Sequence, residues 1–361
     1  MFNLIDETYL QGFNRCLRRS VLGVTVSALW AGAGYALEPN IEIAMKQLNQ
    51  QFSAEVIIPG YEALAIEMGG LVQAAQLFEA EPTEANLSAV RTAWLGAMSR
   101  WASSNAVAFG PVHSLGYSTA LEFPTDEAGL DALLANASET EDFDVASLLP
   151  SLQGFEAMAY ILGTESDKAA ADFSNQERRY LSALTLRAND VTTDILTVWQ
   201  AGWNSNPAYG TLLSTAGNPE NHVYLSVEAG SEEIVRSIIN SLEVVSGEEL
   251  PEVVKASVLL EETPDAVTLQ LLNSSVQGIQ SAYLGTSNSE ANGRVMGLGE
   301  VIAIADPTLD QHIQTSLATA LNGIETTMTN PTDVAPLAEA QLSLNIAFEL
   351  LETEVLPLVQ N

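Results

Sequence analysis

The stretch IIPGYEALAIEMGGLVQAAQLFEA, residues 57–80, decides the fold class of this chain. Its apolar side chains recur in steps of four and three: Ile57, Tyr61, Leu64, Met68, Leu71, Ala75 and Phe78. These steps place them all on one face of an α-helix, so the stretch predicts a long helix with one buried face. Pro82 and Thr83 interrupt the pattern, and Thr83 is a typical N-cap for the helix that follows.

The same spacing recurs along the rest of the sequence. It predicts helices with these apolar stripes: Leu87, Val90, Trp94, Ala97 and Trp101; Leu181, Leu184, Ala188, Val191, Ile195 and Val198; Ile234, Ile238 and Leu242; Leu309, Ile313, Leu317, Ala320 and Ile324; and Leu337, Leu344, Phe348, Leu351 and Val355. Ser174 with Glu177 predicts a capping box, Ser231 a further N-cap, and Asp306 before Pro307 another helix start. No sustained apolar–polar alternation indicates a sheet, so the sequence predicts an all-α protein.

The helices number about eight, which suits two four-helix-bundle-like halves packed together. The segment 204–226 is rich in Gly, Asn, Pro and Ser, so we expect a first half at residues 37–205, a linker at 206–226 and a second half at 227–361. An internal echo links the halves, because QGFEAMAYILGT (153–164) resembles QGIQSAYLGT (277–286). Glycine commonly follows helices, so internal duplication stays a hypothesis at this point.

The charge of the chain restricts its partners. Its 361 residues include 13 Lys plus Arg and 46 Asp plus Glu, a formal net charge of −33, while 47% hydrophobic residues are typical of a globular protein. There are three lysines: Lys46, Lys168 and Lys255. A surface so poor in bases does not neutralise phosphates, which argues against nucleic acid as a partner. Cations and basic partners are favoured instead.

The first 36 residues have the pattern of a secretory signal. Arg15, Arg18 and Arg19 precede an apolar run that ends in Gly34, Tyr35 and Ala36, which predicts cleavage after Ala36. We therefore expect an exported protein of the periplasm or cell envelope, or a secreted one; an uncleaved anchor is the alternative. The single cysteine, Cys16, lies inside this segment, so the mature chain would have no thiolate for catalysis or zinc binding.

Motifs that carry chemistry are sparse. His113, His222 and His312 lie far apart with no partner at ligand spacing, and only His113, after Phe109-Gly110-Pro111-Val112, is a candidate to line a site. An acidic run could bind a cation, but it lacks a calcium-loop pattern and is better explained as a solvated loop: Glu139, Glu141, Asp142 and Asp144. Trp94 and Trp101, seven residues apart, are interpreted as core residues.

Glu156 is the most informative single position. It is the one ionisable residue in the segment GFEAMAYIL, residues 154–162, which is otherwise apolar or small apart from the Tyr160 hydroxyl. A carboxylate on such a helix must reach water, find a base or bind a cation, because burial of an unpaired polar group is costly. Glu156 is therefore the metal-ligand candidate, and simple exposure to water is the alternative.

Several segments, taken in order, resemble the imelysin-like proteins. The landmarks are Val56-Ile57-Ile58-Pro59-Gly60-Tyr61, Ala93-Trp94 through Trp101, Phe109-Gly110-Pro111, the Gly154 helix, Arg179-Tyr180-Leu181, Gly278-Ile279 with Tyr283-Leu284-Gly285, and Leu356-Pro357-Leu358. The resemblance implies an exported all-helical protein of two bundle-like halves. It also implies a link to bacterial iron uptake, and the family has been classed with metallopeptidases on a Gly-x-His-x-x-Glu motif.

That motif is degenerate in this chain. By the resemblance it falls at Gly154, Glu156 and Ala159, so the histidine position holds Glu156 and the glutamate position holds Ala159. Alanine removes one member of a ligand pair at i and i+3, and the sequence offers no other histidine-rich set for zinc hydrolysis. Tyr160 and His113 complete the set of residues expected to line a site.

Three functions follow from these observations. The first is a non-catalytic binding protein linked to iron or metal acquisition, with a site between the two halves around Glu156. The second is a metal-dependent peptidase, which the change to Ala159 disfavours. The third is an acidic envelope protein that binds or scaffolds other envelope proteins. The cofactor is unassigned, with iron or another divalent cation as the candidate.

Overall fold

The computed structural model describes residues 39–138, 142–164, 166, 168–259, 262–286 and 295–360, and these form an all-α fold without a β-strand. An isolated bridge between Trp203 and Asn206 is the β-type pairing within them. The predicted fold class is confirmed. The expected signal segment, Cys16, Glu139 and Glu141 lie outside the described residues.

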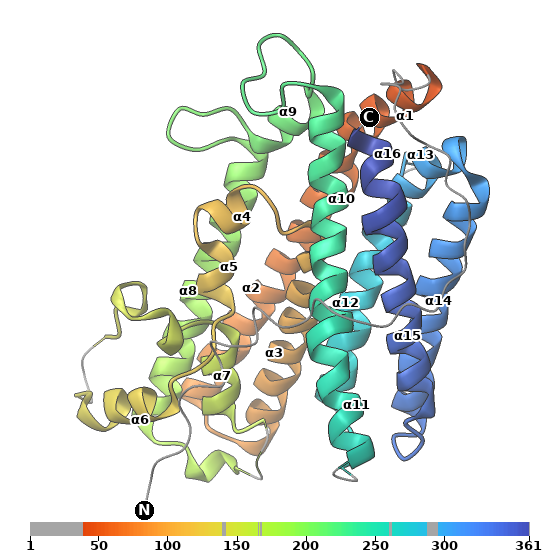
Figure 1. Ribbon diagram of the computed structural model, residues 1–361. Helices are drawn as coiled ribbons and strands as arrows, with labels where there is room; N and C mark the ends of the chain where they lie inside the picture. The colour runs from red at the N-terminus through yellow and green to blue at the C-terminus, as the bar shows by residue number, and fades with distance from the viewer. Residues whose placement is uncertain are drawn as a thin grey trace, which may run out of the picture. The chain divides into compact units, whose positions relative to one another are not determined.

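The helical elements follow one another along the chain (Figure 1). Their bounds are α1 Pro39–Phe52, η2 Ser53–Ile57, α2 Ile58–Ala80, α3 Glu84–Ser104, η3 Asn105–Val107, α4 Pro111–Ser114, α5 Tyr117–Leu121, α6 Glu127–Asn136, η4 Val145–Ser147, η5 Pro150–Leu152, α7 Gly154–Leu162, η6 Ala170–Asp172, α8 Asn175–Gln200, α9 Tyr209–Ser214, α10 Val227–Val244, η7 Val245–Glu249, α11 Leu250–Leu259, α12 Ala266–Leu284, α13 Leu298–Ala305, α14 Pro307–Thr329, α15 Ala335–Leu350, η8 Leu351–Val355 and α16 Leu356–Gln360.

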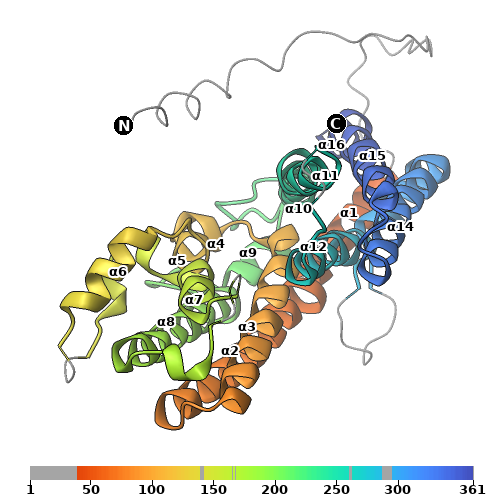
Figure 2. The same ribbon diagram turned by 90° about the horizontal axis from the view of Figure 1, so that it is seen from below.

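The long helices pack in a continuous series from α8 to α15. α2 lies between α8 and α3, α3 packs against α12, α12 against α14, and α14 against α15 (Figure 2). α10 contacts α1, η3, α12 and α15, so it joins the first helix of the described chain to the last ones. The predicted division into residues 37–205 and 227–361 stays a prediction, and the segment between them contains the short helix α9.

The predicted apolar stripes form the core. All of the stripe residues of α2, α3 and α8 are buried, and so are most of those in α10, α14 and α15, with Leu309 and Phe348 only partly covered. Trp94 and Trp101 are 4% and 1% exposed, which confirms them as core residues. Burial of such stripes removes apolar surface from water and is the main favourable term in folding.

The predicted helix starts are confirmed in three cases and wrong in one. Thr83 accepts a hydrogen bond from the Asn86 backbone, Ser174 and Glu177 form a reciprocal capping box, and Asp306 caps α14. Ser231 does not cap a helix, because α10 begins four residues earlier, behind the N-cap Ser226. The Ser231 hydroxyl instead bonds Asn49 Oδ1 of α1 at 3.0 Å, inside the core.

Three helices contain a widened π turn directly before a proline. The backbone N–H of Ile58, Leu250 and Leu356 bonds a carbonyl five residues back, and each of these residues is followed by proline. Proline has no N–H and its ring clashes with the carbonyl four residues earlier, so a wider turn at this point accommodates it. η2, η7 and η8 are therefore built into the sequence by Pro59, Pro251 and Pro357.

The two echo segments share local structure. Gly163 and Gly285 end α7 and α12 in the left-handed conformation, with φ of 60° and 68°. Tyr160 and Tyr283 each donate a hydrogen bond to an aspartate, Asp131 and Asp310. Gly154 and Gly278, near the other end of each segment, both lie against the backbone of another segment. These common features support the hypothesis of an internal duplication.

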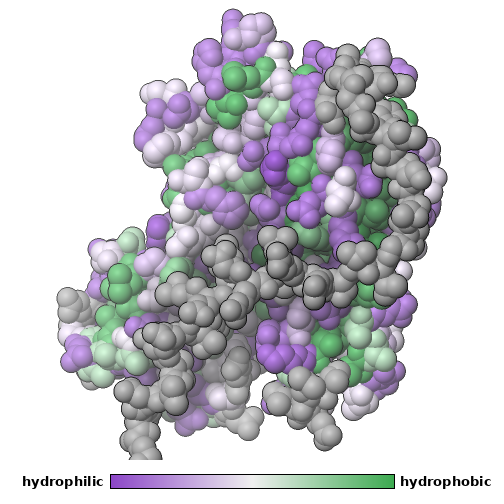
Figure 3. Space-filling model, viewed as in Figure 1, coloured by the Kyte–Doolittle hydropathy of each residue, from purple (hydrophilic) through white to green (hydrophobic). Residues whose placement is uncertain are grey.

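The described surface is neither uniformly hydrophilic nor uniformly hydrophobic. Hydrophilic and hydrophobic residues are interspersed on the face drawn in Figure 3. None of the helices within the described ranges has the length and apolar content needed to cross a membrane.

Candidate functional site

The degenerate motif lies at the start of α7. Gly154 has φ of +75°, and a Cβ atom there would overlap the backbone carbonyl of Leu121 at the end of α5. Only glycine tolerates both this conformation and this close approach without strain. The motif glycine therefore holds α7 against the residue that precedes Glu122.

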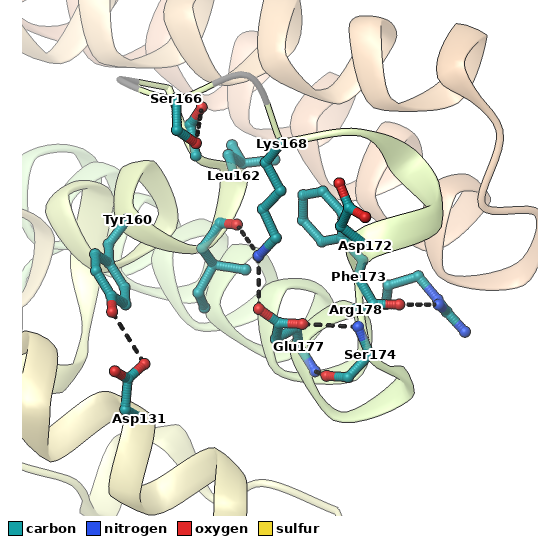
Figure 4. A network of polar contacts seen from close by, with 12 residues as sticks. Asp131, Tyr160, Leu162, Ser166, Lys168, Asp172, Phe173, Ser174, Glu177 and Arg178 are labelled. Carbon is teal, nitrogen blue, oxygen red and sulfur yellow. Dashed lines mark hydrogen bonds and ion pairs between the residues drawn. The ribbon is translucent and has the colours of Figure 1, made fainter.

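The other motif positions face different surroundings. Glu156 is exposed on the first turn of α7, whereas Ala159 is half-buried against the hydrophobic core. Tyr160 is half-buried and donates its hydroxyl to Asp131 Oδ1 at 3.0 Å (Figure 4). Ala159 has no atom that ligates a metal or transfers a proton, so the pair implied by the family motif is absent from this helix.

Two of the few bases in the chain hold the C-terminal end of α7. Arg91 of α3 donates to the carbonyls of Leu162 and Lys168 at 2.7 and 2.9 Å. Lys168 donates to the Ile161 carbonyl at 3.1 Å. It also donates to Glu177 Oε1 at 2.6 Å, as Figure 4 shows. Cations at a helix C-terminus satisfy its free carbonyls and interact favourably with the helix dipole.

The ion pair between Lys168 and Glu177 favours the ionised form of Glu177. Partial burial alone would raise the pKa of Glu177, but hydrogen bonds from Lys168 and Ser174 outweigh it and hold the pKa below its ordinary value. The Lys168 ammonium also lies 4.0 Å from the centre of the Phe173 ring. The position of α7 is thus fixed at one end by glycine and at the other by two cations.

A pocket of about 880 Å³ lies beside these elements. Its lining residues come from positions 101–122, in α3, η3, α4 and α5 and the turns between them, and from positions 233–275, in α10, η7 and α12. The lining therefore combines residues of both predicted halves. Its apolar part includes Trp101, Phe109 and Val245, and its polar part includes asparagines and serines.

Carboxylates dominate the charge of the pocket. Glu122, Glu233 and Glu249 line it together with one guanidinium, Arg236. Trp101 donates its indole N–H to Glu122 Oε2 at 2.6 Å, which orients this carboxylate from the core. Arg236 forms its ion pair with Glu232, at 2.7 Å, one turn earlier on α10.

Glu249 has a raised pKa. It is an exposed residue that lines the pocket, and neighbouring protein atoms partly remove its carboxyl from water. Burial raises the pKa of Glu249 to about 7, and the negative charges of Glu122 and Glu248 add to the rise. Like charges that share a site disfavour simultaneous ionisation. Glu249 and Glu122 line the same pocket, and a cation there would relieve the repulsion between their charges.

The sequence-predicted site residues divide between the pocket and α7. His113 lines the pocket, where its Nδ1 lies 3.1 Å from the Ser118 hydroxyl and burial lowers its pKa. Glu156, Ala159 and Tyr160 are not among the residues that line it. Sequence reasoning missed Glu122 and Glu249. Glu249 precedes Leu250-Pro251, but the π turn that it belongs to is seen only in the structure, so no local sequence signal pointed to the pocket.

A preformed metal centre was not found in the described ranges. No group of three or more His, Cys, Asp or Glu side chains there could hold a metal ion. Within the acidic loop, Asp142 pairs with Arg179 at 3.1 Å, which agrees with a solvated loop that has a local partner. His222 and His312 are exposed, as expected for surface residues.

Comparisons with known proteins place the chain in a family. The family model for imelysin matches residues 57–347. Iron-regulated protein A of Synechococcus elongatus is 28% identical over 360 residues, covering 95% of both chains. Two crystal structures share the fold at 18% identity. They are a putative iron-regulated protein A precursor from Parabacteroides distasonis (TM-score 0.71, 89% of this chain and 95% of that one) and an imelysin-like protein from Psychrobacter arcticum (TM-score 0.69, 90% and 98%). The family match spans most of the chain, and the chain therefore belongs to the imelysin family.

Proposed function

We propose that this imelysin-family chain is an exported, non-catalytic binding protein that takes up a positively charged ligand during iron acquisition. The observation that carries the proposal is the pair Glu122 and Glu249 in a pocket whose guanidinium, Arg236, is engaged by Glu232. A pocket with uncompensated carboxylates attracts cations and disfavours anions. The relative from Synechococcus elongatus supports the iron link through its name, iron-regulated protein A.

Export is supported by the signal-like segment 1–36 and by the description of the Parabacteroides distasonis protein as a precursor. Intact mass or N-terminal sequencing of protein from the envelope fraction tests it. We expect a chain that begins at Leu37. A full-length chain recovered from the cytoplasm would contradict this part of the proposal.

The absence of catalysis is proposed from Ala159, which replaces the motif glutamate. The purified chain should not cleave casein or insulin chains with added zinc. Chelator-sensitive cleavage that co-purifies with the protein and is lost in Glu156→Gln would support the metallopeptidase instead.

The iron role is tested in cells that lack the gene and carry a plasmid copy. We expect uptake of radioactive iron to fall on deletion and to return with the parent and with Glu156→Gln, but not with Glu122→Gln combined with Glu249→Gln. Glutamine keeps the size of the side chain and its helix propensity, so the variants change charge alone. Uptake that is unchanged by deletion, or fully restored by the double variant, would sink the proposal. If restored iron uptake instead requires Glu156, the ligand site lies on α7 and not in the pocket.

A further inference from the structure

The size of the pocket suits an organic molecule better than a single metal ion. Its volume of about 880 Å³ lies within the range of small-molecule sites, roughly 300–1,000 Å³. One side of it is apolar, formed by Ala102, Ala106 and Phe109 around the end of α3 and by Val244 and Val245 at the π turn. These walls offer a surface against which a hydrocarbon body can pack.

The charged residues that line the pocket favour a cationic ligand. Among its described lining residues the bases are Arg236 and His113. Arg236 is engaged by Glu232, although its charge also acts on Glu233. His113 has a lowered pKa and is largely neutral at pH 7. The described lining therefore has three carboxylates, Glu122, Glu233 and Glu249, against one guanidinium, and it keeps an excess of negative charge.

One hydroxyl that lines the pocket has no hydrogen-bond partner among the described residues. Ser275 of α12 is 9% exposed and lines the pocket. Within the described part of the chain its Oγ forms no hydrogen bond, although a helical serine can bond the carbonyl four residues back. This hydroxyl is therefore an open hydrogen-bonding position for a molecule in the pocket.

We propose that the pocket binds an organic molecule carrying a primary ammonium group on an apolar body, with the ammonium between Glu122 and Glu249. The inference rests on the proposed function and names the chemistry of its ligand. An ammonium has three N–H donors and can serve both carboxylates at once without the three grouped ligands that a bare metal ion needs. The apolar walls take the body, and Ser275 supplies a hydrogen bond.

Two classes of molecule have a primary ammonium group on an apolar body. One is a free diamine or polyamine, and the other is an iron chelate of the trihydroxamate class with a pendant amine, whose complex with ferric iron is cationic. The same carboxylates disfavour anionic chelates such as ferric citrate. The second source joins the ammonium site directly to iron acquisition.

The experiment is calorimetric titration of the purified chain with three probes at pH 8. The probes are cadaverine, a ferric trihydroxamate with a free primary amine, and the same chelate acetylated on that amine. We expect at least one amine-bearing probe to bind and acetylation to weaken chelate binding by about tenfold or more, because it removes the charge. Binding of cadaverine alone identifies a diamine, and preference for the chelate identifies the iron-carrying source.

Variants locate the binding site. Glu249→Gln should weaken the amine-bearing probe by about tenfold and Ser275→Ala by about threefold, whereas Glu156→Gln, which lies outside the pocket lining, should not change it. Thermal unfolding of each variant checks that the fold is kept. Failure of all probes, equal affinity for the acetylated chelate, or unchanged affinity in Glu249→Gln would overturn the inference.

The outcomes separate this inference from the proposed function. If iron uptake depends on Glu122 and Glu249 but no amine-bearing probe binds, the ligand chemistry is wrong and the proposed function stands. If the amine-bearing probe binds through Glu249 but deletion leaves iron uptake unchanged, the ligand chemistry stands and the iron role fails.

Discussion

Trp101 Nε1 lies 2.6 Å from Glu122 Oε2, so a core tryptophan of α3 directly holds an acid of the pocket. The indole is 1% exposed while the carboxylate is exposed, and the hydrogen bond therefore links the rigid interior to the ligand-facing surface. A charged acceptor makes such a bond stronger than one between neutral groups.

Replacing this tryptophan should affect both stability and binding. Trp101→Phe removes the donor and some core volume, and we expect about 1–3 kcal/mol of lost stability together with weaker binding of an amine-bearing probe. Trp94→Phe is the matched control. Trp94 also donates its indole N–H, to the Phe155 carbonyl at 3.1 Å, but it does not line the pocket. Urea unfolding and calorimetry should show stability loss in both variants but weaker binding only in Trp101→Phe.

Ligand binding should strengthen as the pH rises through 7. The raised pKa of Glu249, about 7, leaves this carboxyl largely protonated at pH 6 and ionised at pH 8. The other ionisable groups that line its pocket or act on it are Glu122, Glu233, Glu248, Arg236 and His113. Titration of an amine-bearing probe at pH 6 and 8 measures the effect. In Glu249→Gln the affinity should change little between pH 6 and pH 8. An equally large change in the variant would show that another group causes the pH dependence.

The contribution of Glu249 to folding stability should fall as the pH rises, whereas its contribution to ligand binding should grow. Because the folded-state pKa of Glu249 lies above the ordinary value of 4.5, the folded state binds the proton more tightly than the unfolded state. Stability from this group is therefore fully present below pH 4.5 and is lost between 4.5 and about 7. Denaturant unfolding at pH 5 and 8 should show a larger loss in the parent than in Glu249→Gln. A parent and variant that change in parallel would contradict this.

Glycine should be required at position 154 but not at position 70. Gly154→Ala forces a side chain into a left-handed conformation and against the Leu121 carbonyl, so we expect a loss of about 2 kcal/mol or more. Gly70 lies inside α2 with no atom within 4 Å of the Cβ position, and Gly70→Ala should stabilise by about 0.5–1 kcal/mol. Thermal unfolding measures both. Equal effects of the two substitutions would refute the close contact.

The lysine at the end of α7 should matter more than a surface lysine. The side chains of Lys168 and Glu177 are 20% and 22% exposed, whereas those of Lys255 and Glu252 are 59% and 73% exposed. We expect Lys168→Met to cost about 1–2 kcal/mol at pH 7 and Lys255→Met less than about 0.5 kcal/mol. Urea unfolding of the two variants provides the comparison.

The cost of Lys168→Met should also depend on pH. The pKa of Glu177 is lowered in the folded state, so its contribution is present above the ordinary value of 4.5 and is lost as the pH falls through the lowered value. The difference between parent and Lys168→Met should therefore shrink below pH 4.5. A difference that is constant down to pH 3 would show that packing, rather than charge, is the source.

The fold could be predicted from the sequence because its signals are local. The stripe from Tyr61 to Phe78 is buried throughout, and the cap at Ser174 forms as its side chain predicts. The predicted N-cap at Ser231 was wrong because serine occurs both at helix starts and inside helices. The hydrogen-bond partner of Ser231, Asn49, is 182 residues away in the sequence. Periodicity carries no information about such pairings.

The pocket could be predicted only in part for the same reason. His113 was a candidate because it follows a glycine-proline break, and it does line the pocket. Glu122, Glu249 and Ser275 meet there through the packing of α10 and α12 beside α3, and this packing depends on close approaches such as that of Gly278 to the Ser103 backbone. Nothing in the local pattern around Glu122 distinguishes it from an ordinary surface acid.

The π turn at residues 245–249 holds one residue more than the regular helical repeat, directly before Pro251. Such a turn is in effect a one-residue insertion that the helix absorbs locally, so the residues beyond it face nearly the same way as in an uninterrupted helix. Deleting one residue such as Gly247 would close the turn to an α-helical one and bring the proline ring against the carbonyl four residues earlier. The surplus residue is thus what lets α10 and α11 follow one another through a proline.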